Sequence, residues 1–396
     1  MHPADHLRGS KSDKLKGHKI VLGITGSIAA VESVKLCREL IRHGAEVHVV
    51  MSRDAQTIIH PWAMEFASGR KVVTEIDGGV QHVALCGEVP DRADLLLIAP
   101  ATANTISKMA WGIDDTPVTT FATTAIGSGI PVIVVPAMHG SMAAHKIVQD
   151  NISKLRKIGV TFVQARVEES RQKMPSTEEI VSAVIATIGK RDLVGRRVLV
   201  IAGATQEPID DVRVVTNRSS GETGVELAKA AYERGASVLL WMGRAEIELP
   251  AHIDTIRFSS FSDLQRLLKG KRFDIVLFPG AISDYSPKAT AGKIPSDAPE
   301  IKLTLKRNPK LIDGIKARLV VGFKAQARIS DQDLVRESMK LVKRSGCQLV
   351  VANRVEDVKP GRSRALIVDK SGSAEEVRGT KSQLADRILD RIVRMI

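Results

Sequence analysis

Short apolar runs alternate with longer amphipathic stretches along residues 18–188. Apolar runs rich in β-branched residues predict strands at 19–24, 46–51, 94–100 and 131–136. Between and after them, hydrophobic positions at helical spacing predict helices at 28–42 and 176–188. This alternation of strand and helix is typical of a parallel, doubly wound sheet with helices on its faces.

The same alternation restarts in the second half of the chain. Strands are predicted at 197–202, 237–241, 273–278, 319–323 and 348–352, with a helix at 221–234. The fold class predicted is therefore α/β, with two doubly wound domains of Rossmann-like or flavodoxin-like type in tandem and with mostly parallel sheets.

Residues 1–17 lack hydrophobic periodicity and are predicted to be a flexible tail. The first domain is expected at 18–188, and the polar segment 189–194 (GKRDLV) is expected to be a linker. Residues 195–396 then form the second domain. A length of 396 residues agrees with this division, because domains usually hold about 100–200 residues.

Composition narrows the function classes. No apolar run approaches the roughly 18–20 residues of a membrane span, and no signal-peptide pattern occurs, so a cytoplasmic location without membrane contact is expected. Cys37, Cys86 and Cys347 are far apart, which argues against a disulfide framework or a thiolate metal site.

The net charge of +13 comes with only 3% aromatic residues, so anionic small molecules are favoured over nucleic acid as partners. A basic surface without functional meaning explains the charge equally well.

Small and hydroxylated residues follow three of the predicted strands of the first domain. The loop GITGSIA at 23–29 is not a G-x-G-x-x-G sequence, and the second strand ends at Met51-Ser52-Arg53, without an acidic ribose ligand. Both observations disfavour an ordinary NAD domain. Ser27, Ser52, Thr102 and Asn104 are instead predicted to line a pocket for a phosphate and a flavin-sized group. Each of them alone is explained as well by helix capping.

Longer motifs give a specific resemblance. GITGSIAA (23–30), APATAN (99–104) and PAM (136–138) resemble the flavin-dependent cysteine decarboxylase family. AGATQEP (202–208), VRVVTNRSSGETG (212–224), AGKI (291–294), NPKLI (308–312) and VVGFKA (320–325) resemble phosphopantothenate-cysteine ligase. Their fusion in this order resembles the bifunctional enzymes of coenzyme A biosynthesis, over roughly residues 18–370.

For the first domain, the resemblance implies FMN-dependent decarboxylation of phosphopantothenoylcysteine to 4'-phosphopantetheine. FMN serves as the electron sink, and the protein orients it. Gly26, Ser27 and Ile28 match the family's first flavin-binding loop. His82 matches the family's candidate base, and His139 stands where the family motif PAMN has asparagine.

The mobile flap of the family departs from its pattern here. Many relatives carry a catalytic cysteine in the flap, whereas residues 167–175 read VEESRQKMP. Either Lys173 or a water molecule replaces the cysteine as proton donor, or the decarboxylase is altered or lost. An ordinary charged loop explains the segment equally well.

For the second domain, the resemblance implies activation of 4'-phosphopantothenate by CTP to an acyl-cytidylate, from which cysteine displaces CMP. Asn217 matches the residue that holds the acyl-cytidylate, and Arg213 matches an arginine of the same strand and loop. Lys293 matches the lysine that neutralises the nucleotide phosphate, within a loop of the length of an active-site lid.

Further residues of this domain are expected to bind the nucleotide. Ser220 and Gly221 open a predicted helix whose N–H groups suit phosphate, although Glu222 stands where the family often has lysine. Asp284 is expected to contact the nucleotide or its Mg²⁺ ion. The others expected at the nucleotide are Asn308, Pro309, Phe323, Lys340 and Arg344.

The leading hypothesis is a two-step enzyme that makes 4'-phosphopantetheine from 4'-phosphopantothenate, cysteine and CTP. The alternative is a working ligase whose first domain is a flavin-binding regulatory or catalytically silent module, which the absent flap cysteine permits. A flavin prenyl-transfer activity lacks support from the attached ligase. The resemblance also implies a homo-oligomer with sites shared between subunits.

Overall fold

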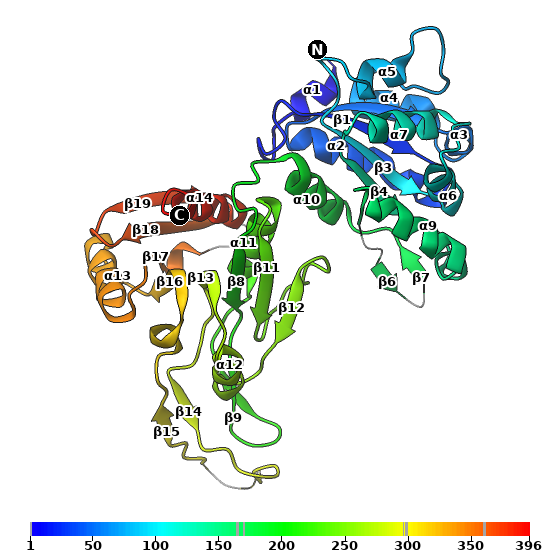
Figure 1. Ribbon diagram of the computed structural model, residues 1–396. Coiled ribbons are helices and arrows are strands. Elements are labelled where there is room, and N and C mark those ends of the chain that lie inside the picture. The colour runs from blue at the N-terminus through cyan, green and yellow to red at the C-terminus, as the bar shows by residue number, and fades with distance from the viewer. Residues whose placement is uncertain (1, 164–165, 169–170, 296, 298–299, 359–361) are drawn as a thin grey trace. The chain divides into compact units, whose positions relative to one another are not determined.

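The computed structural model describes residues 2–163, 166–168, 171–295, 297, 300–358 and 362–396, with the side chains of 166–168 and 171–173 left aside. It divides into two compact units, Met1–Arg191 and Asp192–Ile396 (Figure 1). The division falls inside the segment 189–194 that the sequence marks as a linker.

The described residues of the first unit form a five-stranded parallel sheet. In spatial order its strands are β2 (Glu46–Met51), β1 (Lys19–Ile24), β3 (Leu95–Ala101), β4 (Val132–Pro136) and β5 (Thr161–Phe162). Every residue of β3 is buried, because both faces of a parallel sheet are covered. The strands predicted at 19–24 and 46–51 have these bounds, and those predicted at 94–100 and 131–136 shift by one residue at most.

Helices cover both faces of this sheet (Figure 1). Successive side chains of a strand point to opposite faces, so Leu22 and Leu97 join one core while Val21 and Leu96 join the other. The first core holds residues of α2 (Ser33–Arg42), α4 (Pro61–Ser68) and α10 (Thr177–Ile188). The second holds residues of α5 (Gln81–Cys86), α6 (Ala103–Trp111), α7 (Pro117–Gly127) and α9 (Lys146–Lys157).

Two details differ from the sequence prediction. The helix predicted at 28–42 starts as a 3-10 turn, η1 (Ile28–Glu32), before α2. The segment predicted as a flexible tail is packed: it contains α1 (Pro3–Leu7), Leu15 is fully buried, and the Gly9 N–H donates to the Ile41 carbonyl at 3.1 Å. The tail prediction is wrong because a few buried side chains anchor a mostly polar segment that has no periodicity.

The described residues of the second unit form an eight-stranded sheet that is mostly parallel, as the fold class predicts. In spatial order it contains β12 (Asp254–Arg257), β11 (Ser237–Met242), β8 (Arg197–Ala202), β13 (Phe273–Phe278), β16 (Ala317–Gln326), β17 (Leu349–Arg354), β18 (Ser363–Asp369) and β19 (Ala374–Gly379). Only its last two pairings, β17 with β18 and β18 with β19, are antiparallel.

Helices again cover both faces. Residues of α11 (Glu222–Glu233) and α14 (Lys381–Val393) pack in the core on one face. Residues of α12 (Phe261–Leu268) and α13 (Asp331–Ser345) pack in the core on the other. Among the described residues of both units, no helix is long and apolar enough to cross a membrane.

Two hairpins extend from the second sheet. One pairs β9 (Gln206–Pro208) with β10 (Val214–Thr216), and the other pairs β14 (Tyr285–Pro287) with β15 (Leu305–Arg307). β14 lies against β9, and the Ser286 hydroxyl donates to the buried Glu207 carboxylate at 2.8 Å. The two hairpins are therefore joined at their base (Figure 1).

Candidate active sites

Hydroxylated residues cap the helices that begin at the carboxyl edge of the first sheet. Ser27 follows β1 and accepts the Ala29 N–H at 3.4 Å. Ser52 follows β2 and accepts the Ala55 N–H at 3.2 Å, and Thr102 follows β3 and accepts the Thr105 N–H at 3.2 Å. A capping hydroxyl still has its own proton to donate. Each of the three hydroxyl oxygens therefore caps a helix, and each hydroxyl can still donate its proton to an anionic ligand.

The strand ends that carry these caps are tied together. The buried Thr25 hydroxyl donates to the Pro100 carbonyl at 2.8 Å and accepts the Thr102 N–H at 3.0 Å. Gly26 faces α3 (Arg53–Ile58): a Cβ at Gly26 would lie 2.4 Å from the Asp54 Cβ. The loops after β1, β2 and β3 therefore approach closely, and only glycine fits at position 26.

Two predicted flavin-binding residues point outward along this edge. Ile28 is 78% exposed, and Asn104 is exposed on the first turn of α6. Val31 of η1 is a further large apolar side chain that is 53% exposed. The edge therefore presents capped helix ends together with exposed apolar side chains.

His82 lies on the first turn of α5, where its ring meets that of Phe121 edge to face at a centroid distance of 6.5 Å. Its Nδ1 atom is buried without a hydrogen-bond partner in the described part of the chain. Buried polar atoms without a partner are rare and call for an explanation. No contact among the described residues joins His82 to Ser52 or Thr102.

His139 follows β4 and is exposed. It precedes the short helix α8 (Gly140–Ala143), and its Nδ1 lies 3.0 Å from the Ser141 hydroxyl. The flap backbone forms a hairpin of β6 (Arg166–Glu168) and β7 (Arg171–Lys173), and β7 lies against α8. The flap therefore approaches the turn that carries His139. The Lys173 side chain lies outside the described part of the structure.

A cavity of about 310 Å³ in the second unit gathers five of the residues predicted to bind the nucleotide: Asp284, Pro309, Phe323, Lys340 and Arg344. Ten further residues line it: Phe278, Gly280, Ile282, Ser283, Lys310, Leu311, Ile312, Lys324, Glu337 and Leu341. Phe278 ends β13, and Phe323 and Lys324 stand near the end of β16, so the cavity lies at the carboxyl edge of the sheet. Ligands of open α/β sheets bind at this edge.

The cavity carries more positive than negative charge. Lys310 pairs with the Asp284 carboxylate, and Lys340 pairs with Glu337 at 2.6 Å. Arg344 pairs with Asp313, at 3.2 Å. Lys324 forms no ion pair with any described residue. A ligand that brings phosphate would therefore meet one free cation and several that can exchange partners.

The remaining predicted residues lie outside the cavity lining. The Asn308 side-chain amide donates to the Ser283 carbonyl at 3.0 Å and to the Ser286 hydroxyl at 2.8 Å, and its backbone N–H donates to the Asp284 carbonyl at 2.8 Å. Asn308 therefore fixes the base of the β14–β15 hairpin beside the cavity.

Asn217 reaches the loop that lines the cavity. Its side-chain amide donates to the Ala281 carbonyl at 3.1 Å. The fully buried Thr205 holds the same loop: its hydroxyl accepts the Ser283 N–H at 3.0 Å, and its carbonyl accepts the Thr216 hydroxyl at 2.8 Å. Thr205 was not among the predicted site residues, although it lies in the AGATQEP motif shortly after β8.

Ser220 and Gly221 precede α11, and Gly221 has a φ of +80°. A Cβ at Gly224 would lie 2.1 Å from the Ala202 Cβ, so the first turn of α11 packs closely on the end of β8. Glu222, the departure from the family's lysine, forms an ion pair with the buried Lys381 of α14. Lys381 therefore offsets the negative charge at this helix start.

Arg213 and Lys293 come from loops that are hydrogen-bonded to each other. The Arg213 Nη1 atom donates to the Asp210 carboxylate at 2.7 Å and to the Ile294 carbonyl at 3.1 Å. Lys293 is exposed. Neither Arg213 nor Lys293 lines the cavity of about 310 Å³.

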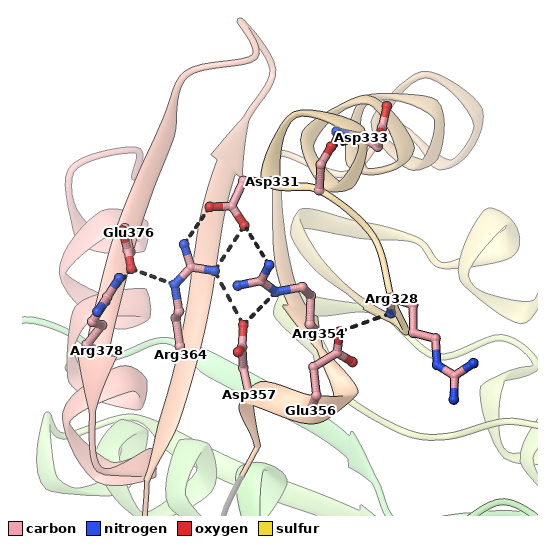
Figure 2. A network of polar contacts seen from close by, with 10 residues as sticks. Arg328, Asp331, Asp333, Arg354, Glu356, Asp357, Arg364, Glu376 and Arg378 are labelled. Atoms are coloured by element: carbon pink, nitrogen blue, oxygen red, sulfur yellow. Dashed lines mark hydrogen bonds and ion pairs between the residues drawn. The ribbon is translucent and has the colours of Figure 1, made fainter.

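A network of ion pairs fixes α13, the helix that carries Lys340 and Arg344 (Figure 2). Arg364 of β18 donates two hydrogen bonds to Asp331, at 2.6 and 3.0 Å, and also contacts Asp357 and Glu376. These carboxylates, Asp331 foremost, raise the pKa of Arg364 further above its usual range. The first turn of α13 is therefore tied to the antiparallel part of the sheet.

The described residues offer few side-chain ligands for a Mg²⁺ ion. The described residues contain no group of three or more His, Cys, Asp or Glu side chains that could hold a metal ion. Asp284 supplies a single carboxylate, and that carboxylate pairs with Lys310. Any Mg²⁺ ion here would have to be bound largely by nucleotide phosphates and water.

Comparison with known proteins agrees with this architecture. Residues 8–189 match the Flavoprotein family, and residues 193–395 match the DNA/pantothenate metabolism flavoprotein C-terminal domain family. The "Coenzyme A biosynthesis bifunctional protein CoaBC" of Thermococcus kodakarensis is 46% identical over 405 residues, which cover 100% of both chains. The protein of the same name from Methanocaldococcus jannaschii is 35% identical and covers 100% of this chain and 98% of its own.

A solved structure described as "Crystal Structure of FMN-dependent Cysteine Decarboxylases SpaF" is 28% identical to part of this chain. It covers 42% of this chain and 98% of its own, with a TM-score of 0.37.

A flavoprotein domain followed by a pantothenate-metabolism domain defines a class of two-domain enzymes. The chain belongs to the coenzyme A biosynthesis bifunctional protein (CoaBC) family, and it is a bifunctional enzyme with a decarboxylase and a ligase activity.

Gly26→Ala is expected to lower the flavin content of the purified protein. A methyl group at this position would push against the Asp54 Cβ, and overpacking of this kind costs about 1–3 kcal/mol. If this cost falls on the flavin-bound state, it lowers flavin affinity by about 5- to 150-fold. Visible absorbance per chain measures the effect. Gly127→Ala, which enters open space, is the control, and full flavin content in Gly26→Ala would contradict the assignment of this loop.

Proposed function

We propose that the second unit joins cysteine to 4'-phosphopantothenate through an acyl-cytidylate formed from CTP. The first unit then decarboxylates phosphopantothenoylcysteine to 4'-phosphopantetheine with FMN. The observation that carries the ligase half is the cavity that gathers Asp284, Phe323, Lys340 and Arg344 at the carboxyl edge of the second sheet. Membership of the CoaBC family supports both halves.

The ligase must stabilise negative charge that builds on the nucleotide phosphate as the carboxylate attacks. Lys324, Lys340 and Arg344 supply cations in the cavity, and Phe323 supplies a ring face for a pyrimidine. Asn217, held at the Ala281 carbonyl beside the cavity, is assigned to hold the acyl-cytidylate while cysteine attacks. Lys293 is assigned to the phosphate, because it matches the lysine of the related ligases and is exposed to a ligand.

The residues of the first unit fit a bound FMN. Ser27, Ser52 and Thr102 would receive its phosphate and polar edge, Gly26 leaves room for close approach, and Ile28 and Asn104 would flank the ring system. When bound, FMN supplies a reversible electron acceptor, so the decarboxylation needs no external oxidant.

The proton transfers are assigned to this chain's own side chains. His82 is the proposed base, because its buried Nδ1 has no partner among the described residues and imidazole suits proton transfer near neutral pH. His139 is proposed to contact the substrate carboxylate, and Lys173 or water to return a proton. The flap sequence 167–175 favours one alternative: because it has no cysteine, the first unit could be a silent flavin module.

His82→Asn is expected to abolish decarboxylation and to spare ligation. Loss of a general base lowers a rate about 100- to 10,000-fold. Carbon dioxide release from supplied phosphopantothenoylcysteine measures the first activity, and pyrophosphate release measures the second. His60→Asn, which replaces an exposed helix-capping histidine with another capping residue, is the control. Retained decarboxylation in His82→Asn would remove His82 from the mechanism.

Asn217→Asp is expected to stall the ligase after activation. The carboxylate has no N–H for the Ala281 carbonyl and repels an anionic acyl-cytidylate. Mass spectrometry should show the acyl-cytidylate accumulating with little phosphopantothenoylcysteine formed. Decarboxylation of supplied phosphopantothenoylcysteine should stay at the wild-type rate. Wild-type ligation would rule out this role for Asn217.

A homo-oligomer with shared sites is also part of this proposal. Ile28 and Val31 of η1, at the edge where FMN would bind, are 78% and 53% exposed. Exposed apolar side chains that lie together are typical of interaction sites. Light scattering of the purified protein is expected to give a mass of several chains, and a monomer at micromolar concentration would contradict the expectation.

A further inference from the structure

The loop of Lys293 is held on both sides of the lysine by the segment 209–213. On the N-terminal side, the Thr290 N–H donates to the Ile209 carbonyl at 3.0 Å. The Gly292 N–H donates to the Asp211 carboxylate at 2.9 Å, and the Asp211 N–H donates back to the Gly292 carbonyl at 3.3 Å. The backbone that leads into Lys293 is therefore fixed by three hydrogen bonds.

Asp210 and Arg213 hold the C-terminal side. The Ile294 N–H donates to the Asp210 carboxylate at 3.0 Å, and the Arg213 Nη1 atom donates to the Ile294 carbonyl at 3.1 Å. Gly292 and Ile294, the two neighbours of Lys293, thus each make two hydrogen bonds to the segment 209–213. Lys293 itself is exposed, so its side chain remains available to a ligand.

Asp210 is the centre of these contacts. Its side chain is 0% exposed, and its carboxylate accepts the N–H groups of Val212, Arg213 and Ile294 as well as the Arg213 guanidinium. Burial by itself raises the pKa of Asp210, but these hydrogen bonds outweigh it and lower the pKa to about 2. The group therefore stays ionised, and every oxygen lone pair it offers to the two loops is used as a charge-assisted acceptor.

We infer that Asp210 is a positioning residue that presents Lys293 to the nucleotide phosphate. Asp211 and Arg213 hold the same loop, and the three residues together are called the clasp. This inference rests on the proposed role of Lys293 in the ligase. A lysine on a loop fixed at both sides loses less conformational freedom when it meets a phosphate than a lysine on a free loop. The clasp also assigns Arg213 to the support of the loop.

Asp210→Asn tests the clasp. In asparagine an NH₂ group replaces one of the two carboxylate oxygens, and this group cannot accept a hydrogen bond. The variant therefore loses either the contacts with the Ile294 N–H and the guanidinium or the contacts with the Val212 and Arg213 N–H groups. We expect the rate constant kcat for CTP-dependent pyrophosphate release to fall about tenfold or more. Amide hydrogen exchange at 290–294 should become faster, while decarboxylation of supplied phosphopantothenoylcysteine should stay unchanged.

A double-mutant cycle separates positioning from general damage to the fold. In a Lys293→Ala background, Asp210→Asn should change kcat by less than about twofold, because the residue acts through the lysine. Asp211→Asn, at an exposed position, should fold normally and give a smaller loss of the same kind. Asp263→Asn, which changes another multiply hydrogen-bonded carboxylate of this unit, should leave kcat unaltered.

Distinct results would overturn the inference. Equal losses from Asp210→Asn in the wild-type and Lys293→Ala backgrounds would mean that Asp210 acts independently of the lysine. Unchanged hydrogen exchange at 290–294 would mean that the carboxylate does not hold the loop. Wild-type kcat in Lys293→Ala would overturn the proposed role of Lys293 itself, and the positioning role with it.

Discussion

In a parallel sheet all strands end at the same edge, and both units of this chain build their candidate sites there. The parallel register of β1 with β3, and of β8 with β13, brings together loops that are about 75 residues apart in the chain. Helix starts at that edge leave backbone N–H groups for phosphate. A ligand that carries a phosphate, such as FMN or a nucleotide, therefore suits this edge in both units.

Buried polar side chains then fix the loops that the strands bring close. Thr25 does so in the first unit, and Thr205, Glu207 and Asp210 do so in the second. Each is buried, and its side chain makes at least one hydrogen bond to a segment distant in the chain, so its removal would leave buried donors or acceptors unpaired. The exposed groups that are proposed to meet ligands, Asn217 and Lys293, lie on segments that these buried contacts hold.

Much of the fold could be predicted from the sequence, and the contacts between distant loops could not. Strands 19–24 and 273–278 each contain an apolar run, at 20–24 and 275–278, that is typical of a sheet covered on both faces, and their predicted bounds agree with the structure. β18 and β19 were not predicted. The apolar run of β18 is only four residues long, at 365–368, and β19 lies at the sheet edge with a mostly polar sequence (AEEVRG). Five residues predicted to bind the nucleotide line one cavity: Pro309 and Phe323 lie in sequence motifs, Asp284 matches an acidic family residue, and Lys340 and Arg344 share a helix face. The structural roles of Asn308 and Arg213 could not be predicted, because they depend on hydrogen bonds to carbonyls 25 and 81 residues away.

The two units are proposed to act in turn, so that the product of the ligase is the substrate of the decarboxylase. The direct test is to incubate the purified full chain with 4'-phosphopantothenate, cysteine, CTP, Mg²⁺ and FMN and to follow the products by mass spectrometry. The account predicts that phosphopantothenoylcysteine appears first and is converted to 4'-phosphopantetheine with release of one carbon dioxide per molecule. Accumulation of phosphopantothenoylcysteine without carbon dioxide, or failure to form it, would contradict the account.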